Sequence, residues 1–158
     1  MNLGHIRFFV KSAGVLLIAT ATAKLVSALG HAKILEVLDP VLRISYRGLF
    51  FAVGGIELAV AVYSLVGRKP VVQLCLIAWL ATNFLIYRLA LLALGWQKPC
   101  GCLGNLTDAI HVPPGTADLI LKAGLLYMLV GSYVALYCLW SRRGNSPISP
   151  QRVSNGHN

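Results

Sequence analysis

Charged residues are scarce in this chain of 158 residues, and acidic residues are the scarcer kind. Only 12% of the residues are charged, with 5 Asp and Glu against 14 Lys and Arg, while 57% are hydrophobic. Soluble domains carry roughly 25% charged residues. The sequence also lacks a glycine-rich nucleotide-binding loop, a Ser-His-Asp set and a pair of catalytic carboxylates. These absences argue against an ordinary soluble enzyme.

Two further patterns are missing. No basic face is interleaved with aromatic residues, so the net charge of +9 does not indicate nucleic acid as a partner. Alternation of polar and apolar residues at period two is also absent, which argues against a membrane β-barrel. The Lys and Arg residues instead lie mostly between long apolar runs, the arrangement of a helical membrane protein in contact with lipid.

Four apolar runs can be marked, at about residues 8–29, 48–66, 71–95 and 119–140. Each has about 19 to 25 residues, enough for a helix to cross a hydrocarbon core roughly 30 Å thick. The sequence therefore predicts an all-α fold, a bundle of four transmembrane helices within one domain, residues 1–140. The polar tail, residues 141–158, is expected to be disordered in the cytoplasm.

The distribution of charge between the runs predicts the orientation. Seven basic residues and no acidic residue flank the start of the first run, the second-to-third connection and the end of the fourth: Arg7, Lys11, Arg68, Lys69, Arg142, Arg143 and Arg152. The loops 30–47 and 96–118 contain both signs of charge. Because basic loops stay on the cytoplasmic side, both termini are expected there, with the loop 96–118 in the periplasm. This predicts a multi-pass protein of the bacterial inner (cytoplasmic) membrane.

Two segments near the start allow different interpretations. Residues 19–23, Ala-Thr-Ala-Thr-Ala, could end a signal peptide whose cleavage after Ala23 would leave three spans. The apolar character resumes after Lys24, which favours an uncleaved helix. The loop 30–47 has an apolar stripe interrupted by Asp39-Pro40, so we expect a short amphipathic helix or turn at the membrane surface.

The motif Cys100-Gly101-Cys102 is the sharpest candidate for chemistry. Glycine tolerates the backbone angles of so small a disulfide ring, and strain in that ring would make the disulfide exchange-active. An oxidising periplasm is where such chemistry is useful. A passive local disulfide remains an alternative. Asp108 and His111 could join both cysteines around a metal ion, although that spacing matches no standard zinc arrangement.

The other two cysteines, Cys75 and Cys138, fall inside the third and fourth runs near their cytoplasmic ends. The membrane core separates them from the loop 96–118 by roughly 30 Å. Free cysteines are readily buried, so we expect both to pack within the bundle.

Glu57 and Arg88 are ionisable residues inside the second and third runs. By helical rise, Glu57 lies about 15 Å and Arg88 about 10 Å from the outer face. Charges at such depth are expensive unless paired, so we expect an intramembrane polar network in which Glu57 pairs with Arg88. Lys24 could join the pair or extend to the surface, and Asn83 could extend the network. A structural clamp and a functional polar site both remain open.

Three stretches of the sequence resemble one family of membrane proteins. They are Ala23-Lys24-Leu25, Gly54-Gly55-Ile56-Glu57-Leu58, and Tyr87-Arg88-Leu89 followed by Cys100-Gly101-Cys102-Leu103-Gly104. The last is similar to a C-x-C-F-G pattern, with Leu103 in place of Phe. Over roughly residues 10–140 the chain resembles the MauE branch of the DoxX-like four-helix proteins. The resemblance implies a role in disulfide formation or maturation of periplasmic proteins, methylamine dehydrogenase in the namesake case.

Three functions remain as hypotheses. In the first, Cys100 and Cys102 exchange electrons with a periplasmic thioredoxin-like protein or a client protein. The chain has no second cysteine pair near the same face, so a relay to quinone would need a partner subunit in a homo- or hetero-oligomer. Quinone stays open as a cofactor, and no motif indicates another. The alternatives are a non-catalytic membrane assembly factor and a small-solute transporter that uses the region of Glu57 and Arg88.

Overall fold

The computed structural model describes residues 3–30, 33–95 and 114–144. These ranges contain the long helices α1 (Leu3–Leu29), α2 (Tyr46–Val66), α3 (Pro70–Ala93) and α5 (Pro114–Gly144), with a short 3₁₀ helix, η1 (Lys33–Glu36), between α1 and α2. Each long helix includes a stretch long and apolar enough to cross a membrane, namely Gly4–Leu29, Tyr46–Val66, Pro70–Ala93 and Leu119–Ser141. The predicted all-α fold with four membrane-spanning helices is therefore confirmed.

The first and last long helices extend beyond the apolar runs marked in the sequence. The first helix begins at Leu3 rather than near residue 8, and α5 runs from Pro114 to Gly144. Residues 141–144 thus continue the last helix instead of opening the polar tail. The apolar run marks the lipid-buried part of a helix, whereas backbone hydrogen bonding continues into the polar flanks.

The turn between α2 and α3 is built by a short polar sequence. Gly67 ends α2, and a Cβ atom at this position would lie 2.5 Å from the Tyr63 carbonyl oxygen, so the close approach requires glycine. The Gln73 side-chain nitrogen donates to the carbonyl oxygens of Tyr63, Ser64 and Gly67 at 3.2, 3.0 and 2.8 Å. Carbonyls at a helix end in lipid need such partners. Pro70 occupies the first turn of α3, where its missing N–H is not needed.

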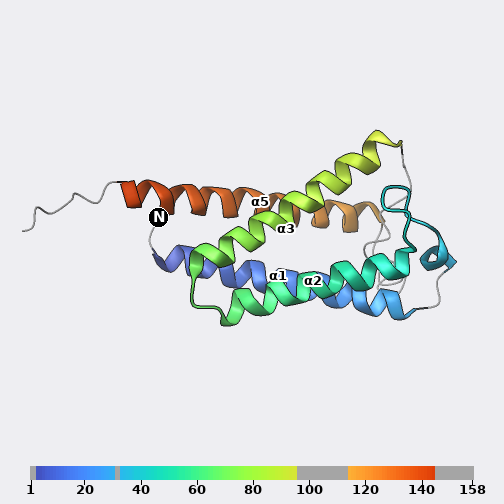
Figure 1. Cartoon of the computed structure of the whole chain (residues 1–158), viewed down its shortest axis with the longest axis horizontal. Helices are drawn as coiled ribbons and strands as arrows, with labels where there is room; N and C mark the ends of the chain where they lie inside the picture. The colour runs from blue at the N-terminus through green and yellow to red at the C-terminus, as the bar shows by residue number, and fades with distance from the viewer. Residues whose placement is uncertain (1–2, 31–32, 96–113, 145–158) are drawn as a thin grey trace, which may run out of the picture.

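The long helices run alternately up and down the molecule, and they pack as two pairs (Figure 1). Most of the contacts of α1 are with α2, and most of those of α3 are with α5. The start of α1, the α2–α3 turn and the end of α5 lie together at what we call the basic end (Figure 1). The η1 segment, the end of α3 and the start of α5 lie at the opposite end, the loop end, where α3 diverges from α2.

Two apolar clusters hold the bundle together. The larger cluster lies toward the basic end and includes Ala13 and Leu17 of α1, Ala61 of α2 and Ile77 of α3, all fully buried. The smaller one, at the loop end, joins Ala28 and Leu35 to Tyr46, Leu49 and Phe50. The larger cluster includes residues of all four long helices, whereas the buried residues of the smaller one come from α1, η1 and α2, so the two helix pairs are held together mainly by the larger cluster.

Large apolar side chains also cover the outside of the helices. Phe8, Leu92 and Trp140 are 75%, 72% and 74% exposed, and many other Leu, Ile, Val and Tyr side chains share this surface. Contiguous apolar surface of this extent is unfavourable in water but suits the hydrocarbon of a bilayer. The structure therefore implies lipid contact around the bundle.

Candidate functional site

A buried ion pair joins α1 to α2 in the apolar interior. Lys24 Nζ donates to Glu57 Oε1 at 2.5 Å, and both residues are buried, with Glu57 only 1% exposed. From the sequence, we expect Arg88 as the main partner of Glu57, with Lys24 as an optional third member. The structure instead pairs Glu57 with Lys24, because α1 packs closely against α2 while α3 leans away at this level.

Glycine and alanine residues bring the two charges together. A Cβ atom on Gly54, three residues before Glu57, would lie 3.1 Å from Leu25 Cγ and 3.4 Å from the Ala21 carbonyl oxygen. Ala21, three residues before Lys24, is fully buried. Residues three or four apart share one face of a helix, and small residues let membrane helices approach closely. The close contact at Gly54 thus places Glu57 beside Lys24.

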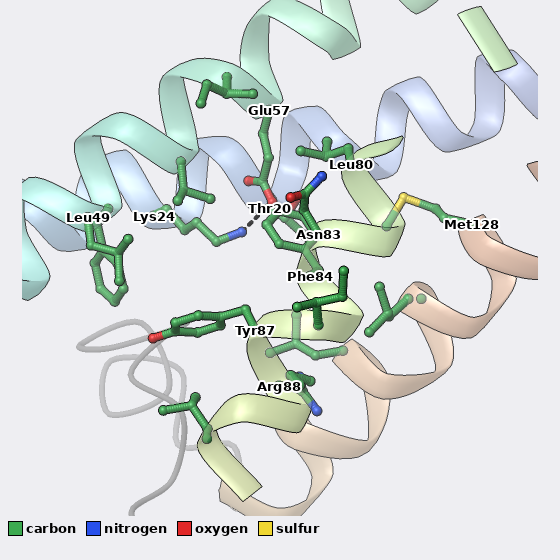
Figure 2. A pocket seen from close by; sticks show the side chains of 18 of the residues that line it. Thr20, Lys24, Leu49, Glu57, Leu80, Asn83, Phe84, Tyr87, Arg88 and Met128 are labelled. Carbon is green, nitrogen blue, oxygen red and sulfur yellow. Dashed lines mark hydrogen bonds and ion pairs between the residues drawn. The ribbon is translucent and has the colours of Figure 1, made fainter. Parts of the chain in front are cut away.

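The pair leaves one acceptor unused. Glu57 Oε2 is buried and has no hydrogen-bond partner among the described residues. Thr20 lies beside the Glu57 carboxylate, and Figure 2 shows the Lys24 side chain extending toward it. Lys24 Nζ also lies 5.1 Å from the centroid of the Phe84 ring, within cation–π range. An incompletely paired carboxylate in hydrocarbon is unfavourable unless another donor reaches it.

The ion pair forms part of the wall of a cavity between the two helix pairs. Its volume is about 470 Å³, and all four long helices contribute to it (Figure 2). The wall is mainly apolar and aromatic. The lining residues Ile56, Trp79 and Ile86 are 44%, 54% and 60% exposed, and the cavity is not enclosed on all sides. The cavity therefore extends from the buried charges to the lipid-facing surface along α2 and α3.

Arg88 and Asn83 line the same cavity from α3. The Asn83 side-chain nitrogen donates to the Trp79 carbonyl oxygen at 2.8 Å, one turn back along the helix. In Figure 2, Arg88 of α3 lies nearer the loop end than Glu57 of α2 does. The predicted polar residues Lys24, Glu57 and Arg88 thus surround one cavity, although the ion pair that the described residues show among them is Lys24 with Glu57.

The segment between η1 and α2 closes the cavity at the loop end. Asp39 is 1% exposed, and its Oδ1 accepts from the backbone N–H groups of Val41 and Leu42 at 2.9 and 2.8 Å. The Tyr87 hydroxyl of α3 donates to Asp39 Oδ2. Val41 and Leu42 line the cavity. The expected amphipathic helix or turn is a 3₁₀ turn followed by this Asp-centred loop, which is tied to α3.

The contact between Asp39 and Tyr87 is not predicted from the sequence. The sequence indicates Tyr87 only as part of the stretch Tyr87-Arg88-Leu89, and Asp39 only as an interruption of an apolar stripe. Asp before Pro is a turn signal, because its side chain can accept from the backbone N–H groups that follow. That signal indicates the loop, but nothing in the sequence indicates which helix the loop contacts.

The candidate residues Cys100, Cys102, Asp108 and His111 lie outside the described residues, so their predicted thiol or metal chemistry stays a prediction. Within the described ranges, no group of three or more His, Cys, Asp or Glu side chains could hold a metal ion. The segment that contains these four residues connects α3 to α5, and the end of α3 and the start of α5 both lie at the loop end.

The cysteines within the helices have free thiols. Cys75 of α3 is exposed on the outside of the bundle, and Cys138 of α5 is partly buried. The expectation that Cys75 packs inside the bundle is therefore wrong. Its neighbours Leu74 and Ile77 are fully buried instead, because the inward face of α3 falls on those positions.

Comparison with known proteins gives one match. No curated protein and no solved structure matches the chain. The family model described as "Methylamine utilisation protein MauE" matches residues 7–141, which include three of the four membrane-spanning stretches and all but the first three residues of Gly4–Leu29. The broader DoxX-like relationship stays a prediction. Together with the four apolar helices, this match shows that the chain belongs to the MauE family, as a multi-pass integral membrane protein.

Proposed function

We propose that this protein supports thiol–disulfide exchange, or the maturation of a client protein, on the periplasmic side of a bacterial cytoplasmic membrane. The family name points to methylamine utilisation, so an enzyme such as methylamine dehydrogenase is the proposed client in that setting. Cys100 and Cys102 are the proposed reactive pair. The observation that carries the proposal is the cavity between the helix pairs with the Lys24–Glu57 pair in its wall, because the segment that contains both cysteines joins the ends of α3 and α5 that lie at the same loop end.

The proposed orientation is supported by the distribution of charge. The basic end carries Arg7 and Lys11 on α1 and Arg68 and Lys69 in the α2–α3 turn, with Arg142 and Arg143 at the end of α5. The described residues of the loop end include Glu36 and Asp39 as well as basic residues. By the positive-inside rule the basic end is cytoplasmic, which leaves the loop end and the cysteine pair outside.

The proposed reaction is an ordinary exchange. A client thiolate attacks one sulfur of the Cys100–Cys102 disulfide and forms a mixed disulfide. The second client thiolate then attacks the client sulfur of that bond, which closes the client disulfide and leaves Cys100 and Cys102 as two thiols. Two electrons pass from the client to the pair. A periplasmic thioredoxin-like protein can take the place of the client in the same exchange.

The test is the redox state and potential of the pair, measured by thiol trapping in intact cells and against a glutathione series. We expect a reversible pair poised near or above roughly −230 mV, the range of exchange-active disulfides. A Cys100→Ser/Cys102→Ser variant should lose client maturation, whereas the matched Cys75→Ser/Cys138→Ser variant should keep it. A pair that stays oxidised below about −300 mV, or a double-serine variant that still matures the client, would replace the redox function with an assembly role.

A further inference from the structure

The polar end of the cavity offers a hydrogen-bond donor and a hydrogen-bond acceptor side by side. Lys24 has three N–H donors and uses one of them on Glu57 Oε1. Glu57 Oε2 is a buried acceptor without a partner among the described residues. A buried carboxylate oxygen in this state favours an occupant that donates to it. The free N–H donors of Lys24 favour an occupant that accepts a hydrogen bond.

The remainder of the cavity selects for a flat, lipophilic molecule. Its volume of about 470 Å³ is far larger than a small inorganic ion or a simple amine requires. The wall includes the aromatic rings of Phe50, Trp79 and Phe84, and the cavity reaches the lipid-facing surface at Ile56 and Ile86. A ligand can therefore enter from the bilayer with its ring inside and its tail in lipid.

Charge excludes the common lipids as the preferred occupant. Lys24 and Glu57 neutralise each other at 2.5 Å, so the innermost part of the site favours a neutral group. A phospholipid phosphate placed there would face the unpartnered oxygen of Glu57. A neutral ring with an oxygen that alternates between carbonyl and hydroxyl matches both groups, since the carbonyl accepts from Lys24 and the hydroxyl donates to Glu57.

We propose that this cavity binds the head group of a membrane quinone, with Lys24 holding the oxidised form and Glu57 the reduced form. The binding of quinone, as proposed, depends only on the described residues of the cavity. Its use in electron transfer rests on the proposed function, and it takes the place of the relay through a partner subunit that the sequence suggests. In that step the two thiols of Cys100 and Cys102 become a disulfide, and quinone becomes quinol, so that two electrons and two protons pass to the ring oxygens.

Trp79 gives a direct measure of binding, because it lines the cavity and quinones quench indole fluorescence. A Trp96→Phe/Trp140→Phe background leaves Trp79 as the one tryptophan of the chain. The purified full-length protein in phosphatidylcholine nanodiscs is titrated with decylubiquinone. We expect quenching that saturates at one site per protein, above the linear quenching that any bilayer quinone produces.

A matched pair of substitutions on α3 tests the location. Ala90 lines the cavity, whereas Ala93 is exposed and does not. Ala90→Phe should fill the cavity and weaken the saturable binding on the order of tenfold or more, equivalent to about 1.4 kcal/mol, while Ala93→Phe should bind as the parent protein does. Quenching of the parent protein that stays linear and does not saturate would overturn the proposal. This result does not depend on any variant. Equal binding by both folded variants would do the same.

The proposed function and this inference can fail separately. The Cys100→Ser/Cys102→Ser variant should bind decylubiquinone like the parent protein, because the cavity is intact. If it binds quinone while the parent protein leaves client thiols unoxidised, the redox function fails and the quinone site stands. If the parent protein oxidises its client but shows only linear quenching, the quinone site fails and the redox function stands.

Discussion

Lys24 and Glu57 are each tolerable inside an apolar bundle because the other is there. Glu57 is 1% exposed, and Lys24 contacts its carboxylate at 2.5 Å. Replacing one member of such a pair leaves the other charge buried without compensation, which is more damaging than replacing both by apolar residues. The pair therefore acts as a unit in stability, whatever ligand the neighbouring cavity takes.

Substitution of Lys24 by methionine tests this dependence. Lys24→Met should lower the free energy of unfolding by about 3–5 kcal/mol, the usual loss when one partner of a buried pair is removed. The double variant Lys24→Met/Glu57→Leu should recover most of that loss. The measurement is denaturant unfolding in mixed micelles, followed by circular dichroism.

Lys11→Met is the matched control, because Lys11 lies on the same helix with its side chain exposed at the basic end. It should change stability by less than about 0.5 kcal/mol. If the single and double variants of the pair were equally unstable, Lys24 would have a role other than neutralising Glu57.

The sequence identified these residues but not their pairing. Glu57 and Arg88 stand out as charges within apolar runs, which is a signal any membrane sequence provides. Which cation reaches Glu57 depends on the rotation and separation of three helices, and those follow from packing at positions such as Gly54. For the same reason the contact of Asp39 with Tyr87 was not foreseen.

Among the elements, the contact between α1 and α2 determines the geometry of the site. Gly54 and Gly55 are adjacent in α2 but differ completely in their surroundings. A Cβ atom on Gly54 would meet Leu25 and Ala21 of α1, whereas nothing lies within 4 Å of one on Gly55. The same glycine substitution can therefore be made at Gly54, against a neighbouring helix, and at Gly55, where no neighbouring atom is close.

Gly54→Leu should force α1 away from α2 and destabilise the protein by about 1–3 kcal/mol, as overpacking usually does. Gly55→Leu should be neutral or stabilising by up to roughly 1 kcal/mol, since leucine favours the helix and its side chain points into lipid. Unfolding in mixed micelles compares the two variants. Equal losses would show that flexibility of α2, rather than its distance from α1, is what both glycines provide.

The extents of the membrane helices were largely predictable because the physical constraint is strong. Backbone groups in hydrocarbon must be hydrogen-bonded within the segment, and a helix is the structure in which one long apolar run satisfies this requirement by itself. The loop 30–47 carries no such constraint. Its 3₁₀ turn, its Asp-centred loop and the positive φ of Arg43, 54°, depend on contacts that the sequence does not display.

At the scale of the whole molecule, the six basic residues of the basic end predict one orientation in the membrane. His5 is exposed near the basic end, and Leu38 is 63% exposed at the loop end. In a cysteine-free background, Leu38→Cys should react with a membrane-impermeant maleimide in intact spheroplasts, whereas His5→Cys should react only after lysis.

Neither substitution removes a Lys or Arg residue, so the labelling reports the native distribution of these charges. Labelling of His5→Cys before lysis would invert the proposed orientation and place Cys100 and Cys102 in the cytoplasm, where thiols are kept reduced. Labelling of both variants before lysis would indicate a mixed population of orientations.

The pairing of Lys24 with Glu57 also bears on how the chain enters the bilayer. Both residues belong to the first two helices, which follow each other in the chain and pack against each other. A nascent chain that has been synthesised only as far as Val66 already contains both charges and the glycine that lets them meet. The first hairpin can therefore insert with its two buried charges, Lys24 and Glu57, already neutralising each other before α3 enters the bilayer.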